Sequence, residues 1–233
     1  VKAYGEALRR DEIYVDAYIG LANTFHRAGE SERALRYLKE AVRLDPTNVA
    51  AWYNTGVVQD TLGRSGEAEK AYRQALEVDP HHAMSHNNLG SLLKRLDRRV
   101  EAERHFRLAL KADPHHVEAK YNLAALLIDD QPGTSVLLLR EVLLLQPDLV
   151  PARHNLAVAL SRVDRPDEAM EQYAWLVEHN PKAPGVYLAM ATLEANRGNT
   201  SEARRLVRQA VEVGGPEVTQ IIASDPVLRG LGG

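Results

Sequence analysis

The sequence predicts an all-α protein, built as a solenoid of antiparallel helix pairs, and three regularities carry this prediction. Prolines recur at intervals of 34, 34, 33 and 34 residues, at Pro46, Pro80, Pro114, Pro147 and Pro181. Small residues keep the same period, as in the series Ala22, Gly56, Gly90, Ala124, Ala157 and Ala191. Each period holds two apolar stripes with helical spacing and a break between them. One such pair is too small to bury its own apolar faces, so successive pairs must stack.

The composition is that of an ordinary folded protein. Of the 233 residues, 45% are hydrophobic and 26% are charged, and the formal net charge is −3. That balance argues against a nucleic-acid-binding protein, which needs a clustered basic surplus. Cysteine is absent, which excludes disulfides and thiolate chemistry. No apolar run is long enough for a transmembrane helix, and the excess of arginine over lysine favours a GC-rich bacterial source.

The period beginning at residue 49 shows the expected helix pair. One face of its first helix carries Trp52, Thr55, Gly56 and Leu62. Gly63 then ends that helix, and Pro80 closes the second. The stripe of the second helix consists of Ala68, Ala71, Tyr72, Ala75 and Leu76. Small residues allow the two helices to approach closely, while the large residues fill the space beside them.

These residues resemble the tetratricopeptide repeat family, whose signature combines aromatic, glycine, alanine and proline positions over 34 residues. The following repeat matches it with Leu89, Gly90, Ala102, Phe106, Ala109 and Pro114. The resemblance covers about residues 1–216 and implies a right-handed superhelix. It also implies that the first helix of each pair lines a concave, partner-binding side.

The period divides residues 15–216 into six expected repeats. Their ranges are 15–48, 49–82, 83–116, 117–149, 150–183 and 184–216. Residues 1–14 match only the second helix of a repeat, so we expect a truncated repeat there and interpret the chain as a fragment of a longer protein. Residues 217–233 are expected to form a capping helix and a tail that covers the last apolar face. The fourth repeat is one residue short, and His86, Lys120 and Arg153 replace the opening aromatic residue in the middle repeats.

Four asparagines occupy one slot in successive first helices, and we call them the asparagine ladder: Asn54, Asn88, Asn122 and Asn155. A carboxamide offers both donors and an acceptor, which match a peptide main chain of any sequence. Asparagine is a mediocre helix former, so mere tolerance of an exposed helix position explains four in one slot poorly. The ladder is similar to that of the O-linked N-acetylglucosamine transferase family. This resemblance implies that the four side chains hydrogen-bond the main chain of an extended partner.

Further groove residues are expected beside the ladder. One slot before its members stand Tyr53, Asn87, Tyr121 and His154, which we expect to contact partner side chains; Lys94, Arg95 and Arg162 add positive charge nearby. Asn23 and Asn54 match the two asparagines with which co-chaperone repeats clamp a terminal carboxylate. However, Ile19, Met84 and Asn88 stand where that clamp carries lysine or arginine, so we reject it.

Two histidine pairs, His81–His82 and His115–His116, follow repeat-ending prolines. Imidazole is a common metal ligand, but these pairs fall on equivalent turns about one helix pair apart, at ~10 Å per helix layer. We therefore predict solvated turn residues and no metal or cofactor. His26, His105 and His179 are expected to be isolated surface residues.

The second helix of the fourth repeat is apolar nearly all round, unlike a surface helix. Residues expected to point outward there and in the next repeat form a possible partner or oligomer patch: Val136, Leu137, Leu144, Met170 and Trp175. Exposed apolar patches usually mark partner surfaces. The alternative is that the one-residue deletion rotates this helix and buries some of the leucines.

The sequence shows no phosphate-binding loop, nucleophile elbow or zinc-protease motif, so we expect no enzyme activity. The predicted function is a scaffold that holds an extended peptide or partner segment in its concave groove. The alternatives are the substrate-recruiting domain of a larger enzyme, such as a glycosyltransferase, and a bacterial envelope or secretion assembly factor. Expected partners are proteins or peptides and a second copy of the chain, without nucleic acid or membrane insertion. For location, the sequence leaves the cytoplasm, slightly favoured, and the periplasm open.

Overall fold

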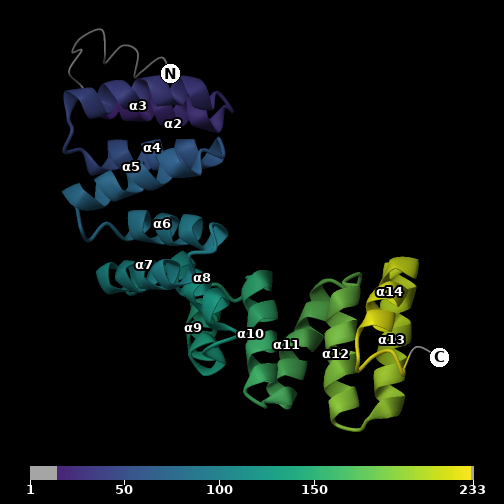
Figure 1. The fold of residues 1–233 in the computed structure, drawn as a ribbon. Helices are drawn as coiled ribbons and strands as arrows, with labels where there is room; N and C mark the ends of the chain where they lie inside the picture. The colour runs from purple at the N-terminus through teal and green to yellow at the C-terminus, as the bar shows by residue number, and fades with distance from the viewer. Residues whose placement is uncertain (1–14, 232–233) are drawn as a thin grey trace. The chain divides into compact units, whose positions relative to one another are not determined.

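The described part of the chain, residues 15–231, consists of helices without strands in this computed structural model (Figure 1). The predicted all-α class and array of helix pairs are confirmed. The predicted helix in residues 1–14 lies outside the described residues. The chain divides into two compact units, which we call unit 1 (Val1–Asn122) and unit 2 (Leu123–Gly233). Each unit is described by itself.

Unit 1 contains three complete helix pairs and the first part of a further helix. Their bounds are α2 Val15–Arg27, α3 Ser31–Leu44, α4 Val49–Thr61, α5 Ser65–Val78, α6 Ala83–Arg95, α7 Arg99–Ala112 and α8 Val117–Leu127, whose last residues belong to unit 2. Unit 2 continues with α9 Pro132–Leu145, α10 Val150–Arg162, α11 Pro166–His179, α12 Pro184–Asn196, α13 Thr200–Gly214 and α14 Pro216–Ser224.

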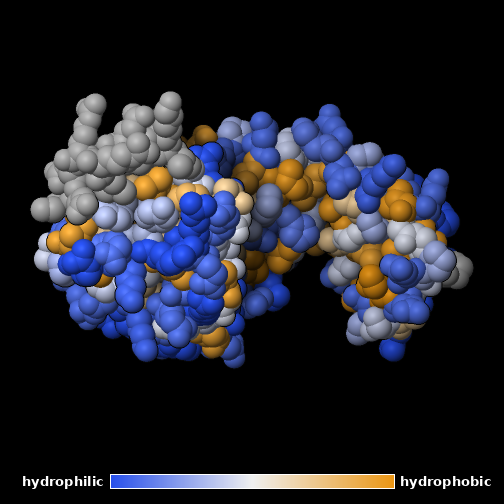
Figure 2. Space-filling view, turned by 90° about the horizontal axis from the view of Figure 1, so that it is seen from above, coloured by the Kyte–Doolittle hydropathy of each residue, from blue (hydrophilic) through white to orange (hydrophobic). Residues whose placement is uncertain are grey.

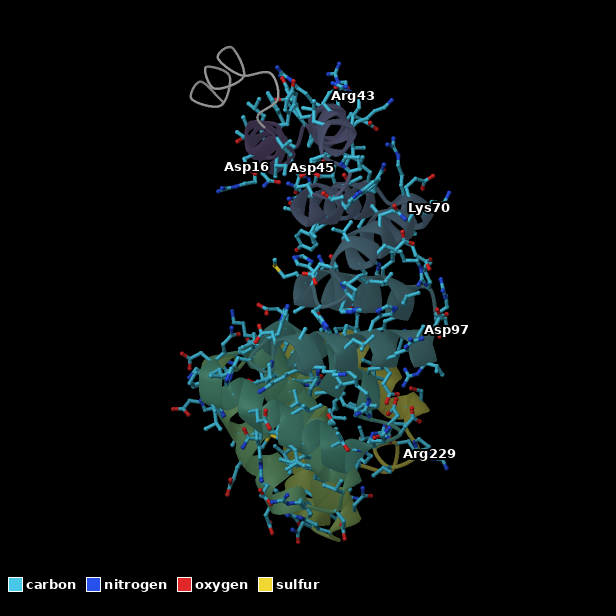
Figure 3. The ribbon with its side chains drawn as sticks, turned by 90° about the vertical axis from the view of Figure 1, so that its left-hand side faces the viewer. Asp16, Arg43, Asp45, Lys70, Asp97 and Arg229 are labelled. Carbon is cyan, nitrogen blue, oxygen red and sulfur yellow. The ribbon has the colours of Figure 1, made fainter. Side chains whose placement is uncertain are left out.

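In unit 1 the first helices of the pairs adjoin one another. Helix α2 packs on α3, α4 on α5 and α6 on α7, while α3 and α5 link each pair to the next. In addition α2 contacts α4, and α4 contacts α6. Figure 3 shows Asp16 of α2 on one side of the unit and Arg43 of α3 and Lys70 of α5 on the other. The first helices therefore form a face of their own.

Two glycines set the closest helix approaches in unit 1. Gly56 of α4 lies under the ring of Tyr72, and Gly90 of α6 lies under Phe106. A Cβ at Gly56 would stand 2.5 Å from ring carbons of Tyr72, and one at Gly90 would stand 2.8 Å from Cε1 of Phe106. Both rings are almost fully buried. The small residues of the repeat pattern thus make room for the large ones.

The turn inside most helix pairs needs one residue in the left-handed region. That residue is Gly29, Gly63, Asp97, Asp164 or Gly198, with φ between 55° and 81°. Aspartate is among the few residues besides glycine that adopt this conformation at modest cost. Asp97, labelled in Figure 3, therefore serves the same turn as Gly63 one repeat earlier.

Side-chain hydrogen bonds stabilise the Asp-Pro turns between pairs, and other side chains in these turns cap the helix that follows. The carboxylates of Asp45, Asp79 and Asp113 each accept a hydrogen bond from the backbone N–H two residues later, at 2.9 Å. At the N-cap of α4, Asn48 Oδ1 accepts from Ala51 N at 3.0 Å. His82 and His116 take the same capping position with Nδ1, at 3.3 and 3.4 Å. These histidines are local capping groups.

The residues that replace the opening aromatic keep one of its hydrogen bonds. Trp52 Nε1 donates to the carbonyl of Pro46 at 2.8 Å. The bond recurs one repeat later from His86 Nε2 to Pro80 at 3.0 Å, and again from Arg153 Nε to Pro147 at 3.1 Å. What these positions share is an N–H donor that holds the preceding turn, not aromaticity.

The shortened fourth repeat keeps its pair together through a buried hydrogen bond. The hydroxyl of Ser135 in α9 donates to the carbonyl of Ala124 in α8 at 2.9 Å. Farther along unit 2, Leu228 and Leu231 of the tail are buried against Val218 and Ile222 of α14 and Leu206 of α13. The residues after α14 thus cover apolar surface of the last two helices.

Candidate peptide-binding surface

The three ladder asparagines of unit 1 lie on α4, α6 and α8, and two of them, Asn88 and Asn122, take part in a polar network. Asn122 Nδ2 donates to Asn87 Oδ1 at 2.9 Å and to Ser91 Oγ at 3.3 Å. Asn87 Nδ2 donates to Asn88 Oδ1 at 3.2 Å, and Asn88 Nδ2 donates to the Tyr53 hydroxyl at 3.3 Å. The network thus crosses three first helices and fixes the orientation of these amides.

The network leaves hydrogen-bonding capacity at the surface. Asn54 Nδ2 donates only to Ala50 of its own helix, at 2.8 Å, so its Oδ1 keeps its lone pairs. The Oδ1 of Asn122 accepts no hydrogen bond from the described residues and is likewise available. Both side chains are partly exposed. Two oriented acceptors therefore face solvent on the first-helix side.

The residues beside the ladder differ in accessibility. Asn87 is buried, with 7% of its surface exposed, so the prediction that it contacts partner side chains is wrong. Its amide is instead held between Asn88 and Asn122. Tyr53 is half-buried, and burial raises the pKa of its phenol; Tyr121 is also partly exposed. These two tyrosines remain the candidates for side-chain contacts in unit 1.

The predicted basic residues form ion pairs near the surface. Lys94 and Arg95 are exposed, and Arg95 pairs with Asp60 of the preceding first helix. In unit 2, Arg162 NH2 lies 2.7 Å from Asp129 Oδ1. Exposed pairs of this kind are worth little to stability. Asn23, on α2, is exposed as well.

The fourth ladder residue, Asn155, lies in unit 2 on α10, beside a pocket of about 320 Å³. Helices α10 and α11 and the start of α12 form this pocket, and its walls are mainly apolar. His154, the predicted side-chain contact, also lines it and stands edge-on to Tyr173 with ring centroids 6.3 Å apart. The sequence assigned both residues to the expected groove but gave no indication of the pocket.

A model of the tetratricopeptide repeat family matches residues 1–49, 19–83, 53–116 and 154–216, together well over half of the chain. The chain belongs to the tetratricopeptide repeat family. The resemblance inferred from the repeat pattern is thereby confirmed. Among curated proteins, none matches the sequence significantly.

Solved tetratricopeptide repeat structures share the fold over most of the chain. PilF of Pseudomonas aeruginosa is 23% identical with a TM-score of 0.73, covering 91% of this chain and 97% of PilF. PilW, a type IV pilus biogenesis factor, is 25% identical with a TM-score of 0.70, covering 90% and 98%. YrrB, a tetratricopeptide repeat protein with an unusual peptide-binding site, is 22% identical with a TM-score of 0.64, covering 77% and 93%.

The predicted apolar patch is smaller than expected. Val136 is 2% exposed and packs inside the repeat, so its assignment to the patch is wrong. Leu137 and Leu144 are 63% and 81% exposed. They lie seven residues apart on α9 and share one side of that helix. The alternative, a rotation of this helix, is not observed, because its buried Ser135, Leu139 and Val142 keep the register of Ala68, Tyr72 and Ala75 in α5. Exposed hydrophobic residues are visible on unit 2 in Figure 2.

Met170 and Trp175 of α11 are only partly exposed. The guanidinium of Arg153 covers the indole of Trp175 at 4.0 Å from the ring centroid, and His179 stacks on it at 3.6 Å between centroids. Arg153 NH1 also donates to Gln172 Oε1 at 3.1 Å. Trp175 is thus part of a fixed stack and offers little free apolar surface.

Within residues 15–231, no three histidine, cysteine or acidic side chains lie close enough to hold an ion together. His105, predicted as isolated, instead has its Nδ1 2.9 Å from Nδ1 of His86. Sequence reasoning missed this contact because the two residues are 19 positions apart, on α6 and α7. The only feature of the sequence that could have indicated the contact is that the two residues fall on the two facing helices of one repeat.

None of the helices between residues 15 and 231 combines the length and apolar character needed to cross a bilayer. The tetratricopeptide fold is typical of interaction scaffolds rather than of catalysts. Its extended surfaces exclude water poorly from a reacting centre.

Proposed function

We propose that this chain is a non-catalytic scaffold that binds an extended segment of a partner protein along its first-helix face. The observation that carries the proposal is the row of oriented, incompletely satisfied carboxamides at Asn54, Asn88 and Asn122 in unit 1. A carboxamide can donate to a peptide carbonyl and accept from a peptide N–H, so it recognises main chain independently of sequence. YrrB, which has a peptide-binding site on the same fold, supports the proposal that the partner segment is a peptide.

The spacing of the row suits an extended chain. Neighbouring packed helices are about 8–10 Å apart, and an extended chain advances about 3.3 Å per residue. Each asparagine would therefore meet about every third residue of the partner. Tyr53 and Tyr121, one position before Asn54 and Asn122, would contact the side chains between.

Replacing Asn54 with alanine is expected to weaken peptide binding about 2- to 10-fold, because it removes one main-chain hydrogen bond. Folding should be preserved, since Asn54 donates only within its own helix and alanine is the better helix former. Peptides selected from a random library against the full chain are the ligands, and fluorescence anisotropy gives their Kd. Asn196→Ala, at an exposed position at the end of α12, is the matched control. Equal affinity of parent and Asn54→Ala for every selected peptide would contradict the proposal.

Asn122 is less suitable as a first test. Its removal would leave Asn87 Oδ1 buried without its donor, which costs about 1–3 kcal/mol. A loss of binding in Asn122→Ala would therefore mix recognition with stability. Asn54 separates the two effects.

The similarity to PilW, a type IV pilus biogenesis factor, over 90% of this chain and 98% of PilW favours one narrower setting, assembly of a bacterial envelope structure. The substrate-recruiting domain of a larger enzyme is the other setting. Both would use the same scaffold activity and differ in the partner.

The exposed leucines of α9 support a second contact, which we assign to a second copy of the chain. Leu137, Leu144 and Leu145 are 63%, 81% and 51% exposed. Apolar surface of this kind is stabilised by burial in an interface. Leu144→Glu should therefore convert a dimer into a monomer in sedimentation or light scattering, and Val100→Glu, at an exposed site of unit 1, is the control. A parent chain that is monomeric at all concentrations would overturn this contact.

A further inference from the structure

The pocket beside Asn155 is a site in unit 2 that the asparagine ladder alone does not describe. Its apolar walls include Val150 of α10, Leu176 of α11 and Val186 of α12. Its polar lining includes Asn155, His154 and His179. A volume of about 320 Å³ is at the small end for ligand pockets. It suits one large side chain better than a whole cofactor.

Asn155 differs from the ladder residues of unit 1 in having a free carboxamide. Asn122 donates to two neighbouring side chains, Asn88 donates once to the Tyr53 hydroxyl, and Asn54 donates once to its own helix. Asn155 forms no side-chain hydrogen bond with any described residue, although it is only partly exposed. A polar group in that position gains from a partner that supplies both a donor and an acceptor.

The histidine wall of the pocket is held in place before any ligand arrives. His179 Nδ1 donates to the carbonyl of Trp175 at 2.9 Å, which leaves Nε2 of the neutral ring as an acceptor. The ring is stacked on Trp175, and the guanidinium of Arg153 also lies over the indole. Preorganisation of this kind reduces the entropic cost of binding.

The chemistry of the lining indicates the class of ligand. No lysine, arginine, aspartate or glutamate is among the residues that form the pocket. A phosphate or carboxylate would therefore find no opposite charge, whereas a neutral amide beside an apolar side chain matches the lining. Apolar walls with one free carboxamide are what a residue of an extended peptide requires.

We propose that this pocket binds one large apolar side chain of the partner segment while Asn155 hydrogen-bonds the main chain of the same residue. The inference rests on the proposed peptide-binding function and adds to it an anchor in unit 2 with a preference for leucine- or phenylalanine-like residues. The asparagines of unit 1 would hydrogen-bond the main chain of a partner. The pocket of unit 2 would select one of its side chains.

The test uses capped amino acids as probes on the full-length chain. N-acetyl-phenylalaninamide and N-acetyl-leucinamide should bind with dissociation constants in the millimolar range, as expected for so small a ligand. They should shift the methyl NMR signals of Val150, Leu176 and Val186 and the side-chain amide signals of Asn155. N-acetyl-alaninamide, which has the same main-chain groups and no large side chain, should bind at least about tenfold more weakly.

Two variants locate the binding. Asn155→Ala should weaken the phenylalanine probe about three- to tenfold, and Val150→Trp should fill the pocket and abolish the shifts. Val213→Trp introduces the same ring at an exposed site on α13, outside the pocket, and should have no effect. Absence of shifts at the pocket methyls, or equal binding in Val150→Trp, would overturn the anchor. If the probes fail to bind the pocket but library peptides still lose affinity in Asn54→Ala, the proposed scaffold function stands and only the anchor is refuted. If neither the probe shifts nor the Asn54→Ala effect is seen, both proposals are refuted.

Discussion

Replacing Phe106 with alanine is expected to lower the free energy of unfolding of unit 1 by about 3–5 kcal/mol. The ring is completely buried and packs directly over Gly90 in the facing helix. Because Gly90 has no side chain to move into the space, the cavity cannot collapse easily. Urea unfolding followed by circular dichroism measures the change.

Substitutions that enlarge the facing glycines test the same close packing from the other side. Gly56→Ala and Gly90→Ala each place a methyl within 3 Å of a buried ring, and overpacking of this kind costs about 1–3 kcal/mol. Gly66→Ala is the matched control, since this glycine lies in the first turn of α5 with no atom within 4 Å of the added methyl. There alanine should stabilise the helix by about 0.5 kcal/mol or less, because the full helix-propensity gain applies to interior positions. Gly90→Ala with parental stability would refute close packing against Phe106, and Phe106→Leu should partly rescue it.

The fold could be predicted because the repeat pattern records close packing directly. Gly56, Gly90, Ala124, Ala157 and Ala191 follow the repeat period and are all buried. Only a small residue fits where the helices of a pair cross closely, so the constraint recurs in every repeat. The turns inside the helix pairs could be predicted in the same way where glycine occupies the left-handed position. At Asp97 and Asp164 that conformation is adopted by aspartate, so the sequence does not reveal it.

Hydrogen-bonding roles were harder to predict. At the opening position of the repeats, Trp52, His86 and Arg153 look unrelated when compared by aromaticity. They are equivalent only as N–H donors to the carbonyl of a proline six residues earlier. A comparison of donors at fixed offsets from each Asp-Pro turn would have found the relation.

For the candidate site, the sequence predicted which helix positions the asparagines occupy but not which side chains they contact. The period correctly placed the asparagines on first helices, yet it could not show that Asn87 is buried between two of them. Val136 failed for another reason: it follows Ser135 at the position that Glu69 holds two repeats earlier, and that position is partly buried in α5 as well. The pocket beside Asn155 is assembled from three consecutive helices, with lining residues between Val150 and Val186. No local pattern encodes such a cavity.

The second large effect is expected with pH, through the contact between His86 and His105. A carbonyl can only accept, so His86 Nε2 must donate to Pro80, and His86 Nδ1 is then the acceptor from His105 Nδ1–H. Burial, the neighbouring His86 and the cations Arg73 and Arg104 lower the pKa of His105 to about 4, although Glu101 acts in the opposite direction. Burial, followed by His81 and His82, also lowers the pKa of His86 despite its bond to Pro80 and the nearby Asp79.

A depressed histidine pKa makes the folded state less stable in acid. Unfolded histidines take up protons near pH 6.5, whereas folded His105 stays neutral down to about 4. Over that interval the unfolded state binds more protons, so the free energy of unfolding falls as the pH falls. Because solvent still reaches the half-buried ring, we expect a loss of about 1 kcal/mol between about pH 7.5 and 5. Capping adds in the same direction, since Nδ1 of His82 accepts from the N–H of Ser85 only when unprotonated.

Urea unfolding of the parent and of His105→Gln across this pH range separates the contribution of the His86–His105 pair to the pH dependence of stability from that of other groups. Glutamine can still donate to His86 Nδ1 but does not titrate, so its curve should be flatter than that of the parent. His115→Gln, at an exposed turn, is the control for losing a histidine. Measurements above about pH 5 avoid Glu69 and Glu101, whose arginine partners lower their pKa values and whose contribution is lost only in stronger acid. Parallel curves for parent and His105→Gln would mean that the acid sensitivity of unit 1 arises elsewhere, with the caps at His82 and His116 as the next groups to replace.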